Sequence, residues 1–423
     1  MALCNNIQNS NTLNNSAVSY QYHRMANGIR LVFRRNQSVV MHCGVYINAG
    51  SRDETKDEEG MAHFIEHAIF KGTKKRKSYH ILNRIDGVGG ELNAYTTKEE
   101  TCIYASAMTQ HIDRCLELFA DIIFNSTFPE KELAKETDVI IDEINSYKDT
   151  PSELIFDDFE ELYFGGHSLA HNILGTPRNI RKFNTNKILS FVKRNYTTDK
   201  MVISIVGNID FQRVVHICEK YFGTQPATVS AGGRQAVTST NSFAEKRHRH
   251  GHQTHALFGC PAYSSFDDKR MVFTLINNIL GGPAMNSRLN VAVREKYGLC
   301  YNIETQYSLF SDSGIFYIYM AMHPDFKDKI IELVFKELDK LKNIPLSTAQ
   351  LHMYKMQLIG QMAINNEQPL NEMQSIGKSF LVYDRVDTID EISAEINGIT
   401  SQQILDAANE ILNREQFSQL IYN

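Results

Sequence analysis

The sequence of 423 residues lacks several features that mark particular classes of protein. It has no run of 18 or more apolar residues, so it predicts no membrane-spanning helix and no membrane partner. Lysine and arginine are absent from residues 1–23, which are rich in Asn and Ser. This composition predicts a polar N-terminal segment over residues 1–22, and it excludes a signal peptide and an Arg-rich transit peptide. Cys4 lacks the apolar run that accompanies a lipoprotein site.

Excess positive charge and paired cysteines are also missing. The net charge is −5, which leaves no basic footprint for a nucleic-acid partner. Hydrophobic residues make up 42% of the chain and charged residues 22%, as in an ordinary soluble globular protein. The seven cysteines are scattered singly, without the spacing of a disulfide framework. We therefore expect a reducing compartment and a cytoplasmic location.

The most informative feature that is present is His63-Phe64-Ile65-Glu66-His67. The apolar spacing of residues 60–70 predicts a buried amphipathic helix, in which positions i, i+3 and i+4 share one face. Both imidazoles and the Glu66 carboxylate then point the same way. Two neutral imidazoles one turn apart can hold one Zn²⁺, and a carboxylate beside them can take a proton from metal-bound water. The pattern is the inverzincin motif H-x-x-E-H, although hydrogen-bonded helix histidines are the alternative.

A third ligand is the next requirement, because catalytic zinc usually has three protein ligands and one open position. Residues 128–144 predict a long helix with Pro129 in its first turn. Glu136 and Glu143 are seven residues apart, two turns along one face, beside an apolar stripe. Carboxylates beside an apolar stripe are costly to bury unless they are paired or bind a metal. The alternative is that Glu136 and Glu143 belong to a solvated acidic face of the helix.

Taken together, these motifs resemble the pitrilysin/insulinase family of zinc metallopeptidases, and more closely its short members related to the catalytic subunit of the mitochondrial processing peptidase. That family pairs H-x-x-E-H with a downstream E-x6-E. The resemblance implies one zinc ion per chain, held by His63, His67 and Glu143, with Glu66 as the general base. It also implies that Glu136 is an outer carboxylate that orients a ligand.

Two further segments match the same family. Residues 287–301 resemble its S-R-L…R-E-K-x-G-L-x-Y segment, which implies that Arg294 and Tyr301 come close to bound substrate. A phenol can donate to the oxyanion of a tetrahedral intermediate, and a guanidinium can hold a substrate carbonyl. The alternatives are that Arg294 is a surface charge and that Tyr301 is an ordinary aromatic residue of a strand. Residues 89–101 resemble the segment that leads into an edge strand beside the zinc, where Asn93 and Ala94 are expected to contact an extended substrate.

The chain repeats one pattern in its two halves. A strand over 103–108 precedes His111 and an amphipathic helix, and a strand over 315–322 precedes His323 and a second such helix. Each half then has another helix, around 130–148 and 347–364. We therefore predict an α+β fold of two similar domains, each a mainly antiparallel sheet with helices packed on one face.

The predicted boundaries follow from composition. Residues 23–222 form the zinc-bearing domain and residues 247–423 the second domain, which carries the Arg/Tyr pair. Residues 223–246, rich in Thr, Ser, Ala and Gly, have the composition of a linker. The tract His248-Arg-His-Gly-His252 is a second metal candidate, but its interleaved arginines favour a solvated basic entry to the next strand.

These observations predict a zinc-dependent endopeptidase that hydrolyses unstructured peptides inside a closed chamber, with Glu66 activating zinc-bound water. Dedicated processing of precursors and a non-catalytic peptide-binding subunit are the alternatives. The resemblance implies a homodimer whose sites are completed in trans, or a heterodimer with an inactive relative.

Overall fold

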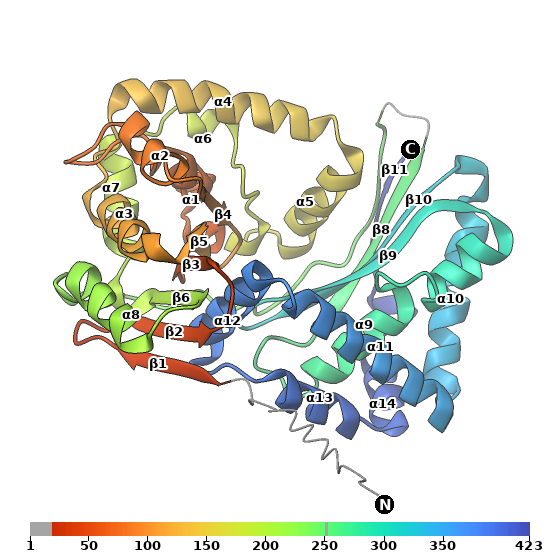
Figure 1. Ribbon diagram of the computed structural model, residues 1–423. Coiled ribbons are helices and arrows are strands. Elements are labelled where there is room, and N and C mark those ends of the chain that lie inside the picture. The colour runs from red at the N-terminus through yellow and green to blue at the C-terminus, as the bar shows by residue number, and fades with distance from the viewer. Residues whose placement is uncertain (1–18, 250–252) are drawn as a thin grey trace, which may run out of the picture.

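The computed structural model describes residues 19–249 and 253–423, which form two sheets that are each covered by helices (Figure 1). Most of the predicted polar N-terminal segment, including Cys4, lies outside the described residues. So does the part of the histidine-rich tract from residue 250 to residue 252. Within the described ranges, no helix has the length and apolar sequence that crossing a membrane requires.

The first sheet has six strands in the order β1-β2-β6-β3-β5-β4. Its strands are β1 (Tyr20–Arg24), β2 (Arg30–Arg35), β3 (Val40–Ile47), β4 (Glu91–Thr96), β5 (Thr101–Met108) and β6 (Met201–Gly207). The pair β2–β6 is parallel and the other pairs are antiparallel. Because β4 is the last strand in this order, one of its long sides has no partner strand in the sheet.

The described part of the first half supplies eight α-helices: α1 (Met61–Ala68), α2 (Ser78–Asp86), α3 (Ile112–Asn125), α4 (Glu130–Lys148), α5 (Pro151–Phe164), α6 (Pro177–Ile180), α7 (Thr185–Asn195) and α8 (Phe211–Cys218). Alternate residues of β3, such as Cys43 and Val45, join a core with the apolar sides of α1, α3 and α7. This alternation is the period of two that a strand imposes on its side chains.

The second sheet has five strands in the order β7-β11-β8-β10-β9. Its strands are β7 (Ala244–Arg247), β8 (Thr254–Ala262), β9 (Cys300–Leu309), β10 (Gly314–Met322) and β11 (Ser418–Tyr422). Only β7–β11 is parallel among these pairs. The helices of this half are α9 (Arg270–Gly281), α10 (Lys327–Asn343), α11 (Thr348–Asn366), α12 (Pro369–Tyr383), α13 (Ile389–Gly398) and α14 (Ser401–Ile411).

The α+β prediction with two mainly antiparallel sheets is confirmed. The repeated order of strand, helix, helix is also present, as β5, α3, α4 in the first half and β10, α10, α11 in the second. The expected helices at 130–148 and 347–364 correspond to α4 and α11.

Each sheet also has a second covered face, which the sequence pattern did not indicate. Helix α5 of the first half packs on the second sheet, where Phe159 meets Leu257 and Tyr317. Helix α12 of the second half packs on the first sheet, where Met373 and Ile376 lie in one cluster with buried residues of β2, β3 and β6. Figure 1 shows both helices lying between the two halves. On each sheet, one face is therefore covered by helices of the same half, as predicted, and the other face is covered by a helix of the other half.

This exchange explains why β6 and β10 are buried along their whole length, since both faces of each sheet are covered. We propose that the sequence boundary between the two halves lies within residues 223–246, as the composition predicts. Even so, one helix of each half packs on the sheet of the other half. The exchange places residues of the two halves in one continuous body.

The close approach of α12 to the first sheet gives a stability test. A Cβ atom on Gly377 of α12 would lie 2.3 Å from Tyr46 Cε2, in a fully buried contact. We expect Gly377→Ala to lower the free energy of unfolding by about 1–3 kcal/mol through overpacking. Gly360 of α11 is the matched control, because a Cβ there meets nothing within 4 Å.

Replacing that control glycine, Gly360→Ala, is expected to raise the free energy of unfolding by up to about 1 kcal/mol, the usual gain in helix propensity. Urea unfolding of the two variants gives both values. Equal effects of the two substitutions would contradict the close packing of α12 on the first sheet.

Candidate metal centre

Helix α1 carries the H-x-x-E-H motif and begins at a fixed point. Gly60 precedes it with a φ of +93°, and a Cβ there would lie 2.7 Å from Gly175 Cα, so glycine is required by conformation and by space. The buried Glu54 carboxylate accepts hydrogen bonds from Gly60 N (2.9 Å) and Ala62 N (2.8 Å). Phe64, with Ile65 and Ala68, anchors the opposite side of α1 in the core. The start and the rotation of α1 are therefore both set.

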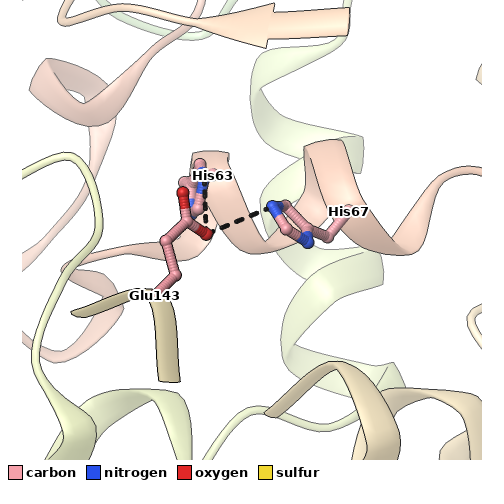
Figure 2. A group of neighbouring side chains, drawn as sticks. All are labelled: His63, His67 and Glu143. Atoms are coloured by element: carbon pink, nitrogen blue, oxygen red, sulfur yellow. Dashed lines mark ion pairs between the residues drawn. The ribbon is translucent and has the colours of Figure 1, made fainter. Parts of the chain in front are cut away.

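The motif histidines converge on one carboxylate of α4 (Figure 2). Glu143 Oε2 lies 3.8 Å from His63 Nε2 and 3.6 Å from His67 Nε2. One potential ligand atom from each of the three residues lies within 4.8 Å of the others. Four-coordinate zinc with ligand bonds near 2.1 Å separates its ligands by about 3.3–3.4 Å, so the spacing suits such an ion with little movement.

The electrostatic surroundings also suit a metal. Burial, and then the neighbouring His67, lower the pKa of His63 to about 4, so its imidazole is neutral at pH 7. A neutral imidazole is the form that binds a metal, and the Glu143 carboxylate adds the negative charge that a cation prefers.

Glu136 lies behind His67, on the same face of α4 as Glu143. Its carboxylate is 3.5 Å from His67 Nδ1 and 2.8 Å from Lys71 Nζ. Burial favours the neutral acid, but His67 and Lys71 together outweigh it and lower the pKa of Glu136. The contact with Glu136 in turn raises the pKa of His67. A carboxylate on the second ring nitrogen is the arrangement that orients a histidine ligand toward a metal.

Glu66 lies on α1 between the two histidines. Burial raises the pKa of its carboxyl group, while the nearby Thr96 hydroxyl and His67 oppose that rise. A carboxyl group with a raised pKa in a partly buried site is suited to accept and return a proton near neutral pH.

The predicted substrate strand is at the edge of the sheet and next to this group. Asn93 and Ala94 lie on β4, paired with Tyr104 and Ile103 of β5. Helix α1 contacts β4 directly. Among the described strands, β4 has a partner on one side only, so its other edge lies beside the motif as strand addition requires.

Arg294 and Tyr301 lie elsewhere, on the second half. Arg294 belongs to the helical turn Asn290–Glu295, and Tyr301, the second residue of β9, is 65% exposed. Within the described residues, neither side chain has a hydrogen bond or ion pair to His63, His67 or Glu143. The structure thus brings together the zinc-motif residues, Glu136 and the β4 edge, but not the Arg/Tyr pair.

A cleft near the motif was missed by sequence reasoning. It has a volume of about 460 Å³ and is lined by Tyr147, Ser152, Glu153, Phe156, Asn302, Glu304 and Tyr319. Tyr147 lies one helical turn beyond Glu143 on α4, and Asn302 directly follows Tyr301. The lining residues come from segments about 150 residues apart, which the exchange of α5 brings together, so no local pattern could indicate the cleft.

Comparison with known proteins places the chain in a family. A family model described as "Insulinase (Peptidase family M16)" matches residues 30–177, and one described as "Peptidase M16 inactive domain" matches residues 182–358. A Bacillus subtilis protein named "uncharacterized zinc protease YmxG" is 33% identical over 398 residues, which cover 93% of this chain and 96% of that protein. The chain belongs to the insulinase family of peptidases, M16.

Other relatives of this M16 chain carry similar names. A Rickettsia felis protein named "uncharacterized zinc protease" is 31% identical over 373 residues, which cover 88% of this chain and 90% of its own. A solved protease from Helicobacter pylori has a TM-score of 0.88 at 19% identity, covering 96% of this chain and 100% of its own. An M16 inactive domain from Pseudomonas fluorescens has the same TM-score and identity, covering 96% and 98%. The solved structures show a shared fold.

These findings confirm the family resemblance, which rested on H-x-x-E-H and E-x6-E. The first family model covers His63, His67 and Glu143, and the model described as inactive covers Arg294 and Tyr301. The division agrees with the geometry, since the candidate metal ligands all lie in the first half.

Metal binding by this M16 chain can be tested on one helix of the structure. We expect Glu143→Gln to weaken zinc binding by about 100-fold or more, because it removes one of three converging ligands and its charge. Asp142→Asn is the matched control: the neighbouring residue is exposed and is not among the converging ligands. Competition with a chromogenic chelator measures both affinities. Equal affinities would show that Glu143 is not a ligand.

Proposed function

We propose that this M16 chain is a zinc-dependent endopeptidase that hydrolyses unstructured peptides. The observation that carries the proposal is the convergence of His63 Nε2, His67 Nε2 and Glu143 Oε2 next to the unpaired edge of β4. The zinc-protease names of its relatives support the same reaction class.

In this proposal His63, His67 and Glu143 hold one zinc ion, and Glu136 orients His67. When bound, zinc supplies a Lewis acid that acidifies water and polarises a carbonyl group. Glu66 accepts the proton as the water oxygen bonds to the scissile carbonyl carbon. The C–N bond then breaks, and Glu66 passes that proton to the leaving amine.

The β4 edge would hold the substrate as an added strand, with Asn93 and Ala94 as contacts. Backbone pairing at an edge needs an extended peptide and reads few of its side chains, because the backbone is common to all sequences. A folded protein cannot present such a strand without local unfolding. The site therefore suits flexible peptides.

Arg294 and Tyr301 would complete the site from a second subunit. Within one chain they lie on the second half, with no hydrogen bond or ion pair to the candidate ligands in the described residues. Because one chain carries both the zinc motif and the Arg/Tyr pair, two copies can complete two sites in trans with two-fold symmetry. We propose a homodimer that encloses a chamber, with a heterodimer as the alternative. Tyr301 would then donate to the developing oxyanion.

A second function, selective processing of precursors, is favoured by the cleft. Glu153 and Glu304 place two carboxylates among the rings of Tyr147, Phe156 and Tyr319. An aliphatic stem can lie on such rings while its cationic end meets a carboxylate, so the cleft suits an Arg or Lys side chain. A peptide with a basic residue near the scissile bond would thus be preferred over its neutral analogue.

A quenched library of unstructured peptides tests the activity, with purified protein in the presence and absence of a chelator. We expect zinc-dependent cleavage, and we expect Glu66→Gln to lower the turnover rate by about 10²–10⁴-fold while zinc content is unchanged. Enrichment of Arg or Lys near the cut bonds would favour selective processing, and its absence general degradation. Unchanged turnover in Glu66→Gln would refute the role of Glu66, while zinc bound without any cleavage would favour a binding subunit.

Mixing two inactive variants tests the assembly. His67→Ala lacks a metal ligand and Arg294→Ala lacks the predicted substrate contact, so each pure variant is expected to have little activity. A mixed dimer regains one intact site, which predicts up to about a quarter of wild-type activity for equal amounts that exchange freely. No recovery after subunit exchange, verified by size and mass, would count against completion in trans.

A further inference from the structure

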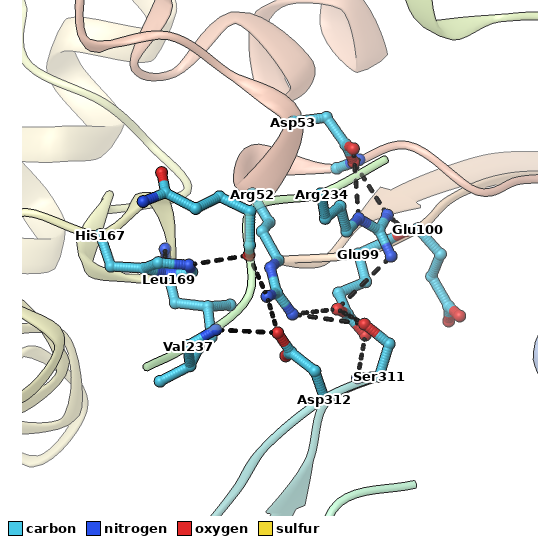
Figure 3. A network of polar contacts seen from close by, with 12 residues as sticks. Arg52, Asp53, Glu99, Glu100, His167, Leu169, Arg234, Val237, Ser311 and Asp312 are labelled. Carbon is cyan, nitrogen blue, oxygen red and sulfur yellow. Dashed lines mark hydrogen bonds and ion pairs between the residues drawn. The ribbon is translucent and has the colours of Figure 1, made fainter. Parts of the chain in front are cut away.

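A cluster of charged side chains joins the two halves (Figure 3). It is formed by four segments of the chain: the turn Ser51–Asp53, the turn 97–100 after β4, residues 234–237, and the turn 310–313 between β9 and β10. We refer to it as the Arg52 cluster. The first two segments belong to the first half, and the last belongs to the second.

Arg52 is at the centre, with a side chain that is 0% exposed. Its guanidinium lies 2.7 Å from a Glu99 oxygen and 2.7 Å from an Asp312 oxygen, so it bridges the two halves. It also donates to the carbonyl oxygen of Gln235 at 2.9 Å. A planar guanidinium can satisfy several acceptors at fixed angles, which a lysine cannot do.

Glu99, one of the partners of Arg52, is itself held by the second half and by Arg234 of the segment between the halves. Glu99 accepts hydrogen bonds from the backbone N of Ser311 (2.9 Å) and from its hydroxyl (2.7 Å). Arg234 donates to Asp53 at 2.8 Å and to the carbonyl oxygen of Glu99 at 2.6 Å. Such a network resists separation, because removing one partner leaves a buried charge without compensation.

Two elements of the candidate site, α1 and β4, are connected to this cluster by short segments of the chain. Asp53 immediately precedes Glu54, whose carboxylate caps the first turn of α1. Glu99 lies in the turn that directly follows β4, where Thr97 N donates to the carbonyl oxygen of Glu100 at 2.8 Å. The metal-motif helix and the candidate substrate strand are thus both tied to the second half through Arg52.

We propose that Arg52, Glu99 and Asp312 are positioning residues for peptide binding. By clamping the turn after β4 against the turn between β9 and β10, they hold the edge strand at the angle that an added peptide needs. The inference rests on the proposed peptidase function. A role in stability alone would lower the unfolding temperature without a separate effect on peptide affinity.

A half-buried arginine that is also paired with two carboxylates offers a comparison. Arg76 lies 2.7 Å from Glu117 and 2.6 Å from Asp121, and all three residues belong to the first half. Asp121 and Asp312 are both partners of a buried or half-buried arginine, but only Asp312 reaches across to the other half. The same isosteric change, Asp to Asn, can therefore be made in either cluster.

The test measures binding of a fluorescent unstructured peptide to zinc-loaded Glu66→Gln protein, which does not turn the peptide over. Adding Asp312→Asn is expected to weaken peptide binding by about tenfold, since it removes the charge that pairs with Arg52 at one end of the clamp. Adding Asp121→Asn is expected to leave the affinity unchanged while lowering the unfolding temperature. Ser311→Ala, which deletes the hydroxyl that donates to Glu99 and accepts from Arg52 but leaves both charges in place, is expected to weaken binding to a smaller extent. Zinc content should be the same in all four proteins.

The outcomes are distinguishable. Weaker binding in Asp312→Asn and Ser311→Ala, but not in Asp121→Asn, supports the positioning role. Unchanged affinity in Asp312→Asn, or an equal loss in Asp121→Asn, overturns it and leaves the proposed function standing. If the Glu66→Gln protein itself binds no peptide, the proposed function fails and the positioning role fails with it.

Discussion

Burial of a second apolar face on each sheet is the constraint on which the arrangement of this chain depends. Neither half covers both faces of its own sheet, so α5 and α12 each cross to the other half. The close contacts of Gly377 with Tyr46, and of Gly259 with Phe159, show how tightly the two exchanged helices fit. Since apolar burial is the dominant favourable contribution to folding, the two halves stabilise each other.

The position of the candidate metal group follows from this packing. Helix α4 runs from the outer side of the first half toward α5, and Glu143 and Tyr147 lie near its C-terminal end (Figure 1). Because α5 must reach the second sheet, the end of α4 is carried to the boundary between the halves. The imidazoles of α1 meet Glu143 there, and the cleft lined by Glu153 and Glu304 opens one helical turn further on. A single arrangement of helices thus places the ligands next to a cleft shared by both halves.

Local patterns in the sequence place the candidate ligands on two helix faces, but they do not bring the two faces together. The spacing of His63, Glu66 and His67 puts them on one helix face, and a seven-residue spacing does the same for Glu136 and Glu143. Whether the two faces meet depends on the contact between α1 and α4, which the family resemblance supplied. The helix exchange and the Arg52 cluster could not be predicted, since they join residues far apart in the chain through shape and charge: 350 positions between β2 and α12, and 260 between Arg52 and Asp312. The edge position of β4 was predictable only in part. The segment 89–101 could be identified in the sequence, but the order of the strands in the sheet could not.

We expect His63, His67 and Glu143 to bind one zinc ion. Anomalous diffraction from crystals of the zinc-loaded protein, collected on both sides of the zinc absorption edge, would locate that ion. We expect one peak per chain, within about 2.0–2.2 Å of both Nε2 atoms and of a Glu143 oxygen. A peak at another group of residues, or none at this position in protein that contains stoichiometric zinc, would contradict this expectation.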